Sequence, residues 1–234
     1  MYSLRESVKI LLRQFGYDIV RTERNLLELN GIDLVLDVGA NIGQYGKLIR
    51  KDGYTGAILS FEPLEKEHKK LATNSIFDPS WNVYSRCALG ERDGTTIIHR
   101  SRNSYSSSLL NMLPAHLEAA PQSIYSSDEK VDEVTLDLIY ESISEDAERV
   151  FLKIDAQGYE QAILKGAKNS LSKIQGIQLE LSVIPLYENQ KKYDYFIREL
   201  INLGFSLWSI RPGFYDPKSG RLLQFDGIFF RDER

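Results

Sequence analysis

Three carboxylates in the second half of the chain have the chemistry of a catalytic centre. Asp155, Glu180 and Asp226 each lie in or next to a short apolar segment that we expect to be a strand. Strands of one open sheet would bring these side chains near its ligand-binding edge. Each could act as a general base toward an alcohol, and together they could hold a divalent cation through oxygen ligands. The structural alternative pairs Glu180 with Lys153 or an arginine.

A glycine-rich turn near the start of the chain is the second feature with chemical meaning. Residues 34–45 read LVLDVGANIGQY, an apolar segment that turns at Gly39 and Gly43 into a helical pattern. Such a turn presents free backbone N–H groups to a ligand. Asn41 stands where a dinucleotide-binding turn carries its middle glycine, and Asp37 would repel phosphate but attract a cation. The turn therefore favours S-adenosylmethionine, which carries a sulfonium and no phosphate.

Two further positions agree with an adenosyl ligand. Glu62 follows the next apolar segment at the separation where an acidic side chain accepts hydrogen bonds from ribose hydroxyls. The small residues of Cys87–Gly90 come after a third predicted strand and could leave room for a flat base. The alternative interpretations are structural: Asp37 would be a helix-cap acid, Glu62 a solvated surface residue, and Cys87–Gly90 an ordinary packed turn.

The elements that must position these residues follow a β-α-β rhythm. This rhythm predicts an α/β fold, built on a doubly wound, mostly parallel sheet in one domain over residues 1–234. After the first strand at Leu34, we expect strands over 57–61, 81–86, 95–100, 130–135, 150–154, 177–181, 205–210 and 228–230, and helices over 43–50, 66–73, 109–120, 136–142 and 193–203 and from Glu160 onward.

Two segments lie outside this rhythm. Residues 1–30 contain an amphipathic helical pattern and form a predicted N-terminal extension, more typical of a core-facing helix than of a membrane anchor. Residues 101–128 are rich in serine and tyrosine and interrupt the domain as an insertion. An insertion of this kind is usually an active-site lid or a disordered loop. We favour a lid, whose hydroxyl groups could recognise a polyol.

Composition excludes several classes of protein. A net charge of −4 argues against a nucleic-acid-binding protein with a broad basic surface. The single cysteine, Cys87, rules out an internal disulfide framework and fits a reducing compartment. No apolar run is long enough to span a membrane, so we expect a cytoplasmic protein. The three histidines, His68, His99 and His116, lack metal-ligand spacing, and only His99 is a candidate base.

Several ordered motifs resemble the FkbM family of S-adenosylmethionine-dependent methyltransferases. They are LDVGANIGQYG at 36–46, SFEP at 60–63, CALG at 87–90, LKIDAQGYEQAILKGA at 152–167, QLELSVIPLY at 178–187 and DGIFFR at 226–231. The resemblance implies the class I, Rossmann-like methyltransferase fold, a three-layer sandwich around a seven-stranded sheet with its last strand antiparallel. It also implies O-methylation of a sugar or polyketide-type hydroxyl. Many family members carry glutamate where Gln157 stands, so that residue is limited to hydrogen bonding.

The resemblance also implies where the cofactor binds. We expect contacts at Asp37, Gly39, Ala40, Asn41, Gly43, Gln44, Tyr45, Glu62, Pro63 and Ala88, with Asp155 near the methyl group. The expected activity is methyl transfer from S-adenosylmethionine to a hydroxyl of a sugar-containing acceptor. A divalent cation and a homodimer are open alternatives. A nucleotide-cofactor oxidoreductase and a noncatalytic adenosyl-binding domain are the competing functions.

Overall fold

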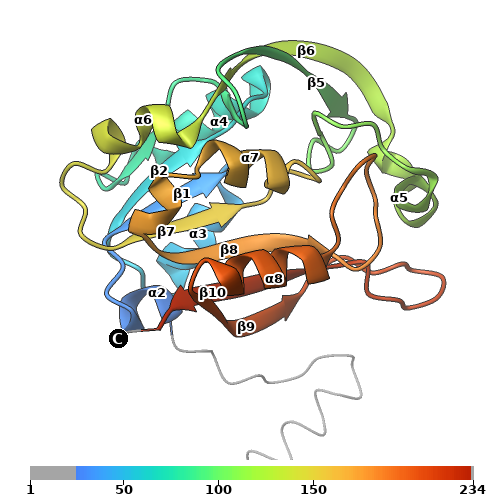
Figure 1. Cartoon of the computed structure of the whole chain (residues 1–234). Helices are drawn as coiled ribbons and strands as arrows, with labels where there is room; N and C mark the ends of the chain where they lie inside the picture. The colour runs from blue at the N-terminus through green and yellow to red at the C-terminus, as the bar shows by residue number, and fades with distance from the viewer. Residues whose placement is uncertain (1–24, 233–234) are drawn as a thin grey trace, which may run out of the picture.

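A seven-stranded sheet forms the centre of the protein in the computed structural model, which describes residues 25–232 (Figure 1). Its strands are β1 (Leu34–Val38), β2 (Ala57–Phe61), β3 (Trp81–Val83), β7 (Val150–Ile154), β8 (Ile174–Ser182), β9 (Phe205–Pro212) and β10 (Gln224–Arg231). They lie in the order β3-β2-β1-β7-β8-β10-β9. The contacts among β1, β2, β3, β7 and β8 are parallel, and β10 is antiparallel to both β8 and β9. The predicted fold class is confirmed, including the antiparallel last strand.

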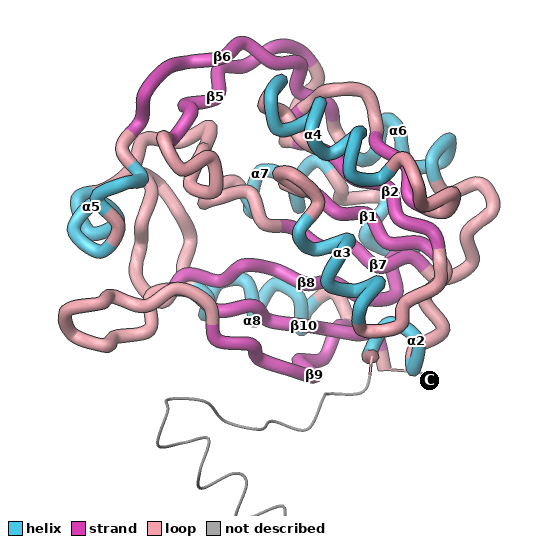
Figure 2. The backbone as a smooth tube through the Cα atoms, turned by 180° about the vertical axis from the view of Figure 1, so that it is seen from behind, coloured by secondary structure: helices cyan, strands magenta, loops and turns pink. Residues whose placement is uncertain are grey.

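Helices cover both faces of this sheet, which makes the three layers. One face carries α2 (Leu26–Leu29), α3 (Gln44–Lys51) and α4 (Glu65–Ser75), and the other carries α6 (Leu136–Ile143), α7 (Glu160–Gly166) and α8 (Tyr193–Asn202). Figure 2, seen from behind, shows α3 in front of the strands. Most of the predicted N-terminal extension, including its amphipathic helix, lies outside the described residues.

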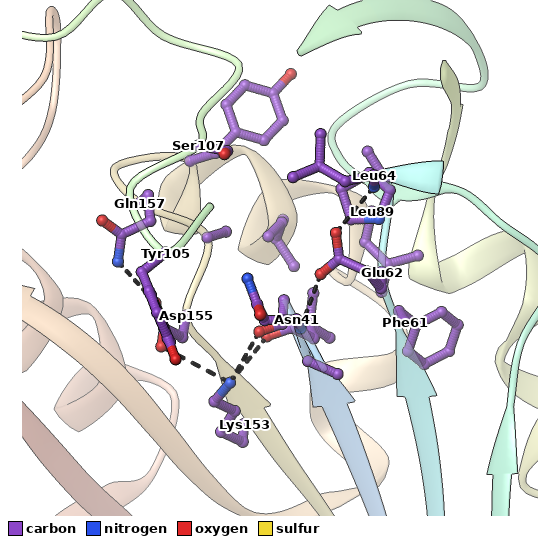
Figure 3. A pocket seen from close by; sticks show the side chains of 18 of the residues that line it. Asn41, Phe61, Glu62, Leu64, Leu89, Tyr105, Ser107, Lys153, Asp155 and Gln157 are labelled. Carbon is purple, nitrogen blue, oxygen red and sulfur yellow. Dashed lines mark hydrogen bonds and ion pairs between the residues drawn. The ribbon is translucent and has the colours of Figure 1, made fainter. Parts of the chain in front are cut away.

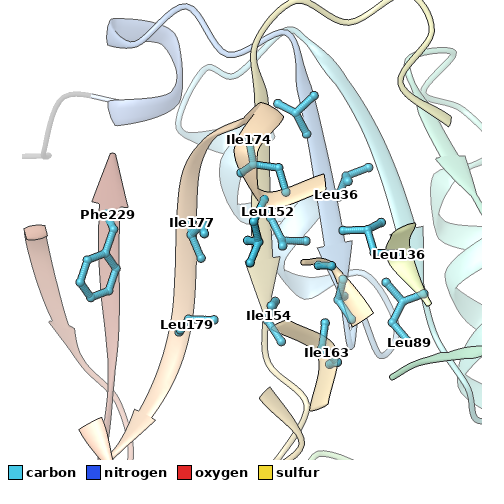
Figure 4. Packing of buried hydrophobic residues seen from close by; sticks show 14 of the residues in the cluster. Leu36, Leu89, Leu136, Leu152, Ile154, Ile163, Ile174, Ile177, Leu179 and Phe229 are labelled. Atoms are coloured by element: carbon cyan, nitrogen blue, oxygen red, sulfur yellow. The ribbon is translucent and has the colours of Figure 1, made fainter. Parts of the chain in front are cut away.

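Strand alternation decides which side chain reaches which layer. Leu36 of β1 packs with Leu152, Ile177 and Phe229 in the core under α6, α7 and α8 (Figure 4). The intervening Val35 is fully buried on the opposite face. Because both faces are covered, the parallel strands read as nearly continuous apolar segments. Removing a core side chain of this size by mutation to alanine typically costs about 2–5 kcal/mol.

A second, smaller sheet differs from the prediction of one sheet. Its strands are β4 (Ala88–Leu89), β5 (Gly94–Ser101) and β6 (Tyr125–Val134), in the order β4-β6-β5. The antiparallel pairing of β5 with β6 continues from Gly94 to Ser101. The strands predicted at 95–100 and 130–135 therefore exist, but they form a separate ribbon, and β6 begins inside the predicted insertion.

The connection between β5 and β6 contains less helix than predicted. Instead of a helix over 109–120, it holds α5 (Pro114–Ala119) and the 3-10 turn η1 (Pro121–Ser123). Proline at the first helical position lacks the N–H that would continue the helix backward, and it keeps Leu113 extended at ψ 156°. Figures 1 and 2 show the β5–β6 ribbon, α5 and the β9–β10 loop on the side where the parallel strands end.

Among residues 25–232, no helix is both long enough and apolar enough to cross a membrane.

Candidate active site

A cavity of about 230 Å³ lies at the carboxyl ends of β1, β2 and β7 (Figure 3). Nine of the predicted cofactor residues line it: Gly39, Ala40, Asn41, Gln44, Tyr45, Glu62, Pro63, Ala88 and Asp155. Asp226 also lines it. Asp37 and Gly43 do not. The insertion contributes Ser104, Tyr105, Ser107 and Leu109, so this segment is ordered against the cavity. Most of the residues predicted to contact the cofactor therefore lie around one cavity, and their contacts with a cofactor stay a prediction.

The glycines of the turn are required by protein contacts. Gly39 has φ +72°, and a Cβ atom on it would lie 1.9 Å from the carbonyl oxygen of Asp155. Gly43 has φ +91°, and its Cβ would lie 2.9 Å from the ring of Trp81. Side chains are excluded at both positions by neighbouring strands, because there is no room for another carbon. Packing thus requires glycine at both positions, and Gly39 also lines the cavity, where a ligand could approach its backbone.

Asp37 is neutralised inside the protein. Its side chain is 0% exposed, and Lys153 Nζ lies 3.0 Å from its Oδ1 atom. The two residues are direct neighbours in the β1–β7 register. Lys153 also donates hydrogen bonds of 3.3 Å to the carbonyl oxygens of Val38 and Gly39. Figure 3 shows Lys153 between Asp155 and the turn that carries Asn41.

This ion pair corrects the predicted role of Asp37. Its charge was expected to face a cationic ligand directly, but Lys153 already occupies that position and Asp37 lies behind the cavity wall. Burial alone would lower the pKa of the Lys153 ammonium, and the charges of Asp37 and Asp155 outweigh burial and raise it. Lys153 therefore stays charged and Asp37 contributes little net charge to the cavity. The signal for this pair was a lysine inside the otherwise apolar strand VFLKI.

Glu62, the residue after β2, is held by two backbone N–H groups. One carboxylate oxygen accepts the N–H of Asn41 and the other accepts the N–H of Leu64, each at 2.8 Å. The side chain is 4% exposed, and burial raises the pKa of the Glu62 carboxyl to about 7. Each oxygen keeps a second lone pair, so hydrogen bonding to ribose hydroxyls remains available to it. Glu62 is not the solvated surface residue of the alternative interpretation.

A bridging amide joins two of the predicted catalytic carboxylates. Gln157 Nε2 donates to Asp155 Oδ1 at 2.9 Å and to Glu180 Oε2 at 2.7 Å. Its oxygen accepts the hydroxyl of Tyr187 at 2.8 Å. Both donor protons of the amide are thereby directed to carboxylates. Gln157 therefore forms hydrogen bonds, as an amide at this position must, and holds Asp155 in one orientation.

Asp155 combines partial exposure with a place on the wall of the first cavity. Its side chain is 38% exposed and lies 3.8 Å from Lys153, too far for a hydrogen bond. Asp226 is partly buried on the wall of the same cavity. Burial, followed by the negative charge of Asp155, raises the pKa of the Asp226 carboxyl to about 6.

Glu180 lacks the ion pair that the structural alternative predicted for it. It lines a neighbouring cavity in place of the first one, and amides, instead of Lys153 or an arginine, are its hydrogen-bond partners. Burial and the charge of Asp155 raise the pKa of the Glu180 carboxyl well above its ordinary value. No group of three or more His, Cys, Asp and Glu side chains among residues 25–232 is arranged to hold a metal ion.

Glu160 and His99 lie away from the first cavity, whereas Cys87 is buried in the wall of that cavity. Glu160 accepts the N–H groups of Ala156 and Gly158, so it holds the turn before its helix by direct hydrogen bonds. His99 pairs with Asp128 at 2.7 Å and lines neither cavity. Burial raises the pKa of the Cys87 thiol to about 12, which agrees with its interpretation as a small packed residue.

Comparison with known proteins agrees with this geometry. Residues 37–207 match the model of the methyltransferase FkbM domain. A search of curated proteins gives no match. Similar solved structures include a fibrillarin from Aeropyrum pernix with bound S-adenosyl-L-methionine (11% identity, TM-score 0.47, 96% of this chain and 74% of that chain). Magnesium protoporphyrin IX methyltransferase from Synechocystis, also with the cofactor bound, is similar over 99% of both chains (10% identity, TM-score 0.47).

A third similar structure is a putative S-adenosylmethionine-dependent methyltransferase from Listeria monocytogenes (9% identity, TM-score 0.47, 86% of this chain and 90% of that chain). At these identities and TM-scores, nothing about the acceptor or the site of this chain follows from the likeness. The family match covers most of the chain and begins at the glycine-rich turn. The chain therefore belongs to the FkbM family of S-adenosylmethionine-dependent methyltransferases.

Proposed function

We propose that this methyltransferase transfers the methyl group to a hydroxyl of a sugar, in a glycan, a nucleotide sugar or a glycosylated metabolite. The accessible carboxylate of Asp155 at the cavity wall is the observation that carries the proposal. An alcohol acceptor needs a base in the transition state, and a carboxylate within reach of the hydroxyl supplies one. The Ser- and Tyr-rich segment against the cavity agrees with a hydroxylated acceptor.

The lining and the charge of the cavity suit S-adenosylmethionine. Pro63, Leu64, Ala88, Leu89 and Ile98 give it an apolar side, opposite the polar groups of Asp155 and Asp226. Lys153 is the one cation among the lining residues, and Asp37 neutralises it, so the acidic character of the wall remains. A cationic ligand suits such a wall, whereas the two phosphates of a dinucleotide would meet acids without a free counter-charge. When bound, S-adenosylmethionine supplies a methyl group made electrophilic by its sulfonium.

The residues of the chain then have separate tasks in transfer. The acceptor hydroxyl forms the new O–C bond, the S–C bond breaks, and Asp155 takes the hydroxyl proton. Gln157 orients Asp155 through the 2.9 Å hydrogen bond. Asp226 is the second candidate base on this wall, whereas Glu180 contacts the acceptor from the neighbouring cavity. The divalent cation suggested by the three carboxylates stays a prediction, for which a chelator is the direct test.

Substitution of Asp155 tests this assignment. Asp155→Asn keeps the size and the hydrogen-bonding oxygen but removes the base, so we expect turnover to fall by about 10²- to 10⁴-fold. Binding of S-adenosylhomocysteine, measured by calorimetry, should change little. Exposed Asp146 provides the matched control, because its substitution by asparagine should leave turnover unchanged.

The acceptor is identified by incubation with labelled methyl donor and a panel of glycans, nucleotide sugars and glycosides, with and without chelator. Unchanged turnover in Asp155→Asn on the acceptor found would remove Asp155 from catalysis. Tight binding of NAD without any response to S-adenosylhomocysteine would instead favour the oxidoreductase alternative. Donor binding without transfer to any acceptor would favour the noncatalytic alternative.

A further inference from the structure

A second cavity of about 250 Å³ adjoins the first. Its wall combines segments that are far apart in sequence: the β5–β6 connection, β8, the β9–β10 loop and β10. The lining residues are Asn103, Tyr105, Ser106, His116, Ala120, Gln122, Ser123, Gln157, Glu180, Phe214 and Gln224. Tyr105 and Gln157 also line the first cavity. A molecule in the second cavity would therefore lie beside the amide that orients Asp155.

The polar groups of this cavity are organised before any ligand binds. Asn103 Nδ2 donates to the hydroxyls of Ser106 and Ser123 at 3.3 and 3.0 Å, and these hydroxyls lie 3.0 Å from each other. On the opposite side, Gln224 Nε2 donates to Glu180 Oε2 at 2.7 Å. Each hydroxyl and each carboxylate retains further hydrogen-bonding capacity. Fixed groups of both kinds, donors and acceptors, suit a ligand with several hydroxyls.

His116 supplies an unsatisfied group in the same wall. Its ring is 2% exposed and packs between Tyr187 and Phe214, with ring centroids 5.2 and 5.5 Å away. Nδ1 is buried without a hydrogen-bond partner among the described residues. Burial lowers the pKa of the imidazole to about 4, so the ring is neutral at physiological pH. A neutral imidazole both donates and accepts, which matches a hydroxyl group.

The absence of cations from the wall of the second cavity disfavours anionic ligands. None of the residues that line this cavity is lysine or arginine, and Glu180 is an acid. A phosphate or carboxylate placed here would be desolvated without a cation beside it. Phe214 and the exposed Tyr105 add the aromatic surface that binding pockets use for ring-shaped ligands.

We infer that the second cavity is the acceptor subsite and that it takes an uncharged, polyhydroxylated sugar ring. The inference rests on the proposed sugar O-methylation and narrows it, because uronic acids and sugar phosphates are excluded from this subsite. The sugar lies against His116, Ser123 and Gln224. Its reacting hydroxyl faces Gln157, which lines both cavities, and so points toward the first cavity. His116 acts in binding, whereas Asp155 acts on the reacting hydroxyl.

The test compares neutral and anionic acceptors. Methyl transfer from labelled donor is measured on methyl glucoside, methyl glucuronide and glucose 6-phosphate, on matched galactose and mannose series, and on neutral disaccharides. We expect a preference for neutral members on the order of 100-fold in kcat/KM. His116→Leu should raise KM for the preferred acceptor by about 3- to 10-fold with little change in kcat, as loss of one binding hydrogen bond does.

Two controls keep the result interpretable. His68→Leu changes a histidine that lines neither cavity and should leave KM unchanged. Ser123→Ala is a smaller change that should also raise KM for the preferred acceptor. It replaces His116→Leu as the test if that variant folds poorly. S-adenosylhomocysteine binding should be equal in all variants, which separates acceptor recognition from damage to the cofactor cavity.

The outcomes distinguish the two proposals. Transfer to sugars with an anionic preference, or with KM unaffected by both His116→Leu and Ser123→Ala, overturns the acceptor subsite and leaves sugar O-methylation standing. Donor binding without transfer to any sugar overturns sugar O-methylation, and the subsite with it. Neutral preference together with the raised KM supports both.

Discussion

The two sides of the active site use the same residue type in opposite ways. On the β1 side, Asp37 is paired with a lysine and Glu62 accepts two backbone N–H groups. On the β7–β8 side, Asp155 and Glu180 accept hydrogen bonds from the amide of Gln157, which orients a carboxyl group without bringing an opposite charge to it. The carboxyl groups on the two sides thus differ in the kind of partner that holds them, and we propose that this difference separates structural from reactive acids. The variants below test that difference in decreasing order of expected effect.

Breaking the buried ion pair should have the largest effect. Lys153→Met leaves Asp37 charged and unpaired in the interior, and the free energy of unfolding should fall by about 3–5 kcal/mol. Adding Asp37→Asn to that variant should restore most of the loss, since no buried charge then remains. Urea unfolding monitored by fluorescence measures both.

Exposed Lys173 is the matched control for that pair. It bonds to Glu141 on the surface, and Lys173→Met should cost less than about 1 kcal/mol. If Lys153→Met were as harmless as Lys173→Met, Asp37 would not be held by charge pairing. The distinction between the two sides of the site would then fail.

Replacing the bridging amide should have an intermediate effect. Gln157→Glu would place a third carboxylate between Asp155 and Glu180 and remove both hydrogen bonds that the amide donates to them. We expect a loss of about 1–3 kcal/mol in stability at pH 8, and a smaller loss at pH 5 where the added carboxyl can bind a proton. Denaturation at the two pH values measures it.

Gln161→Glu serves as its control. The amide of Gln161 donates to the hydroxyl of Tyr195 at 3.1 Å, and that hydroxyl can donate to a carboxylate in return. Stability should therefore change little and should not depend on pH in the same way. Equal losses in the two variants would mean that Gln157 has no special relation to the carboxylates.

The smallest effect concerns Glu160, a structural carboxylate on the β7 side. Burial raises the pKa of its carboxyl from 4.5 to about 7. Between those pH values the folded protein keeps a proton that the unfolded chain has lost, so the free energy of unfolding falls as pH rises through this window. Glu160→Gln retains an oxygen that can accept both backbone N–H groups. In this variant the free energy of unfolding should fall less steeply with pH, by at most about 1.4 kcal/mol per pH unit.

Exposed Glu145 is the control, and Glu145→Gln should leave the slope unchanged. An equally steep curve for Glu160→Gln would show that the buried carboxyl is ionised across the whole window. In that case Glu160 would carry a negative charge near Asp155. The distinction between structural and reactive carboxyl groups would then not follow from their partners.

Local patterns in the sequence were sufficient for the fold class, and they brought most of the predicted cofactor residues to the wall of one cavity. The apolar segments around Leu36, Leu152 and Ile177 predicted buried parallel strands, and their connections predicted the edge at which ligands bind. The small ribbon of β5 and β6 was not predicted as a separate sheet, because strand propensity says nothing about which strands pair. Pro114 was the local signal that the predicted helix over 109–120 begins later.

The sequence by itself determined which acids and amides this protein has and, through strand periodicity, that several of them meet at one edge of the sheet. Only the tertiary structure decided what each carboxylate does. The register of β1 with β7 pairs Asp37 with Lys153, and the loop of Gln157 reaches both Asp155 and Glu180. The charge and reactivity of a carboxyl depend on partners within a few ångströms, and those partners come from distant parts of the chain.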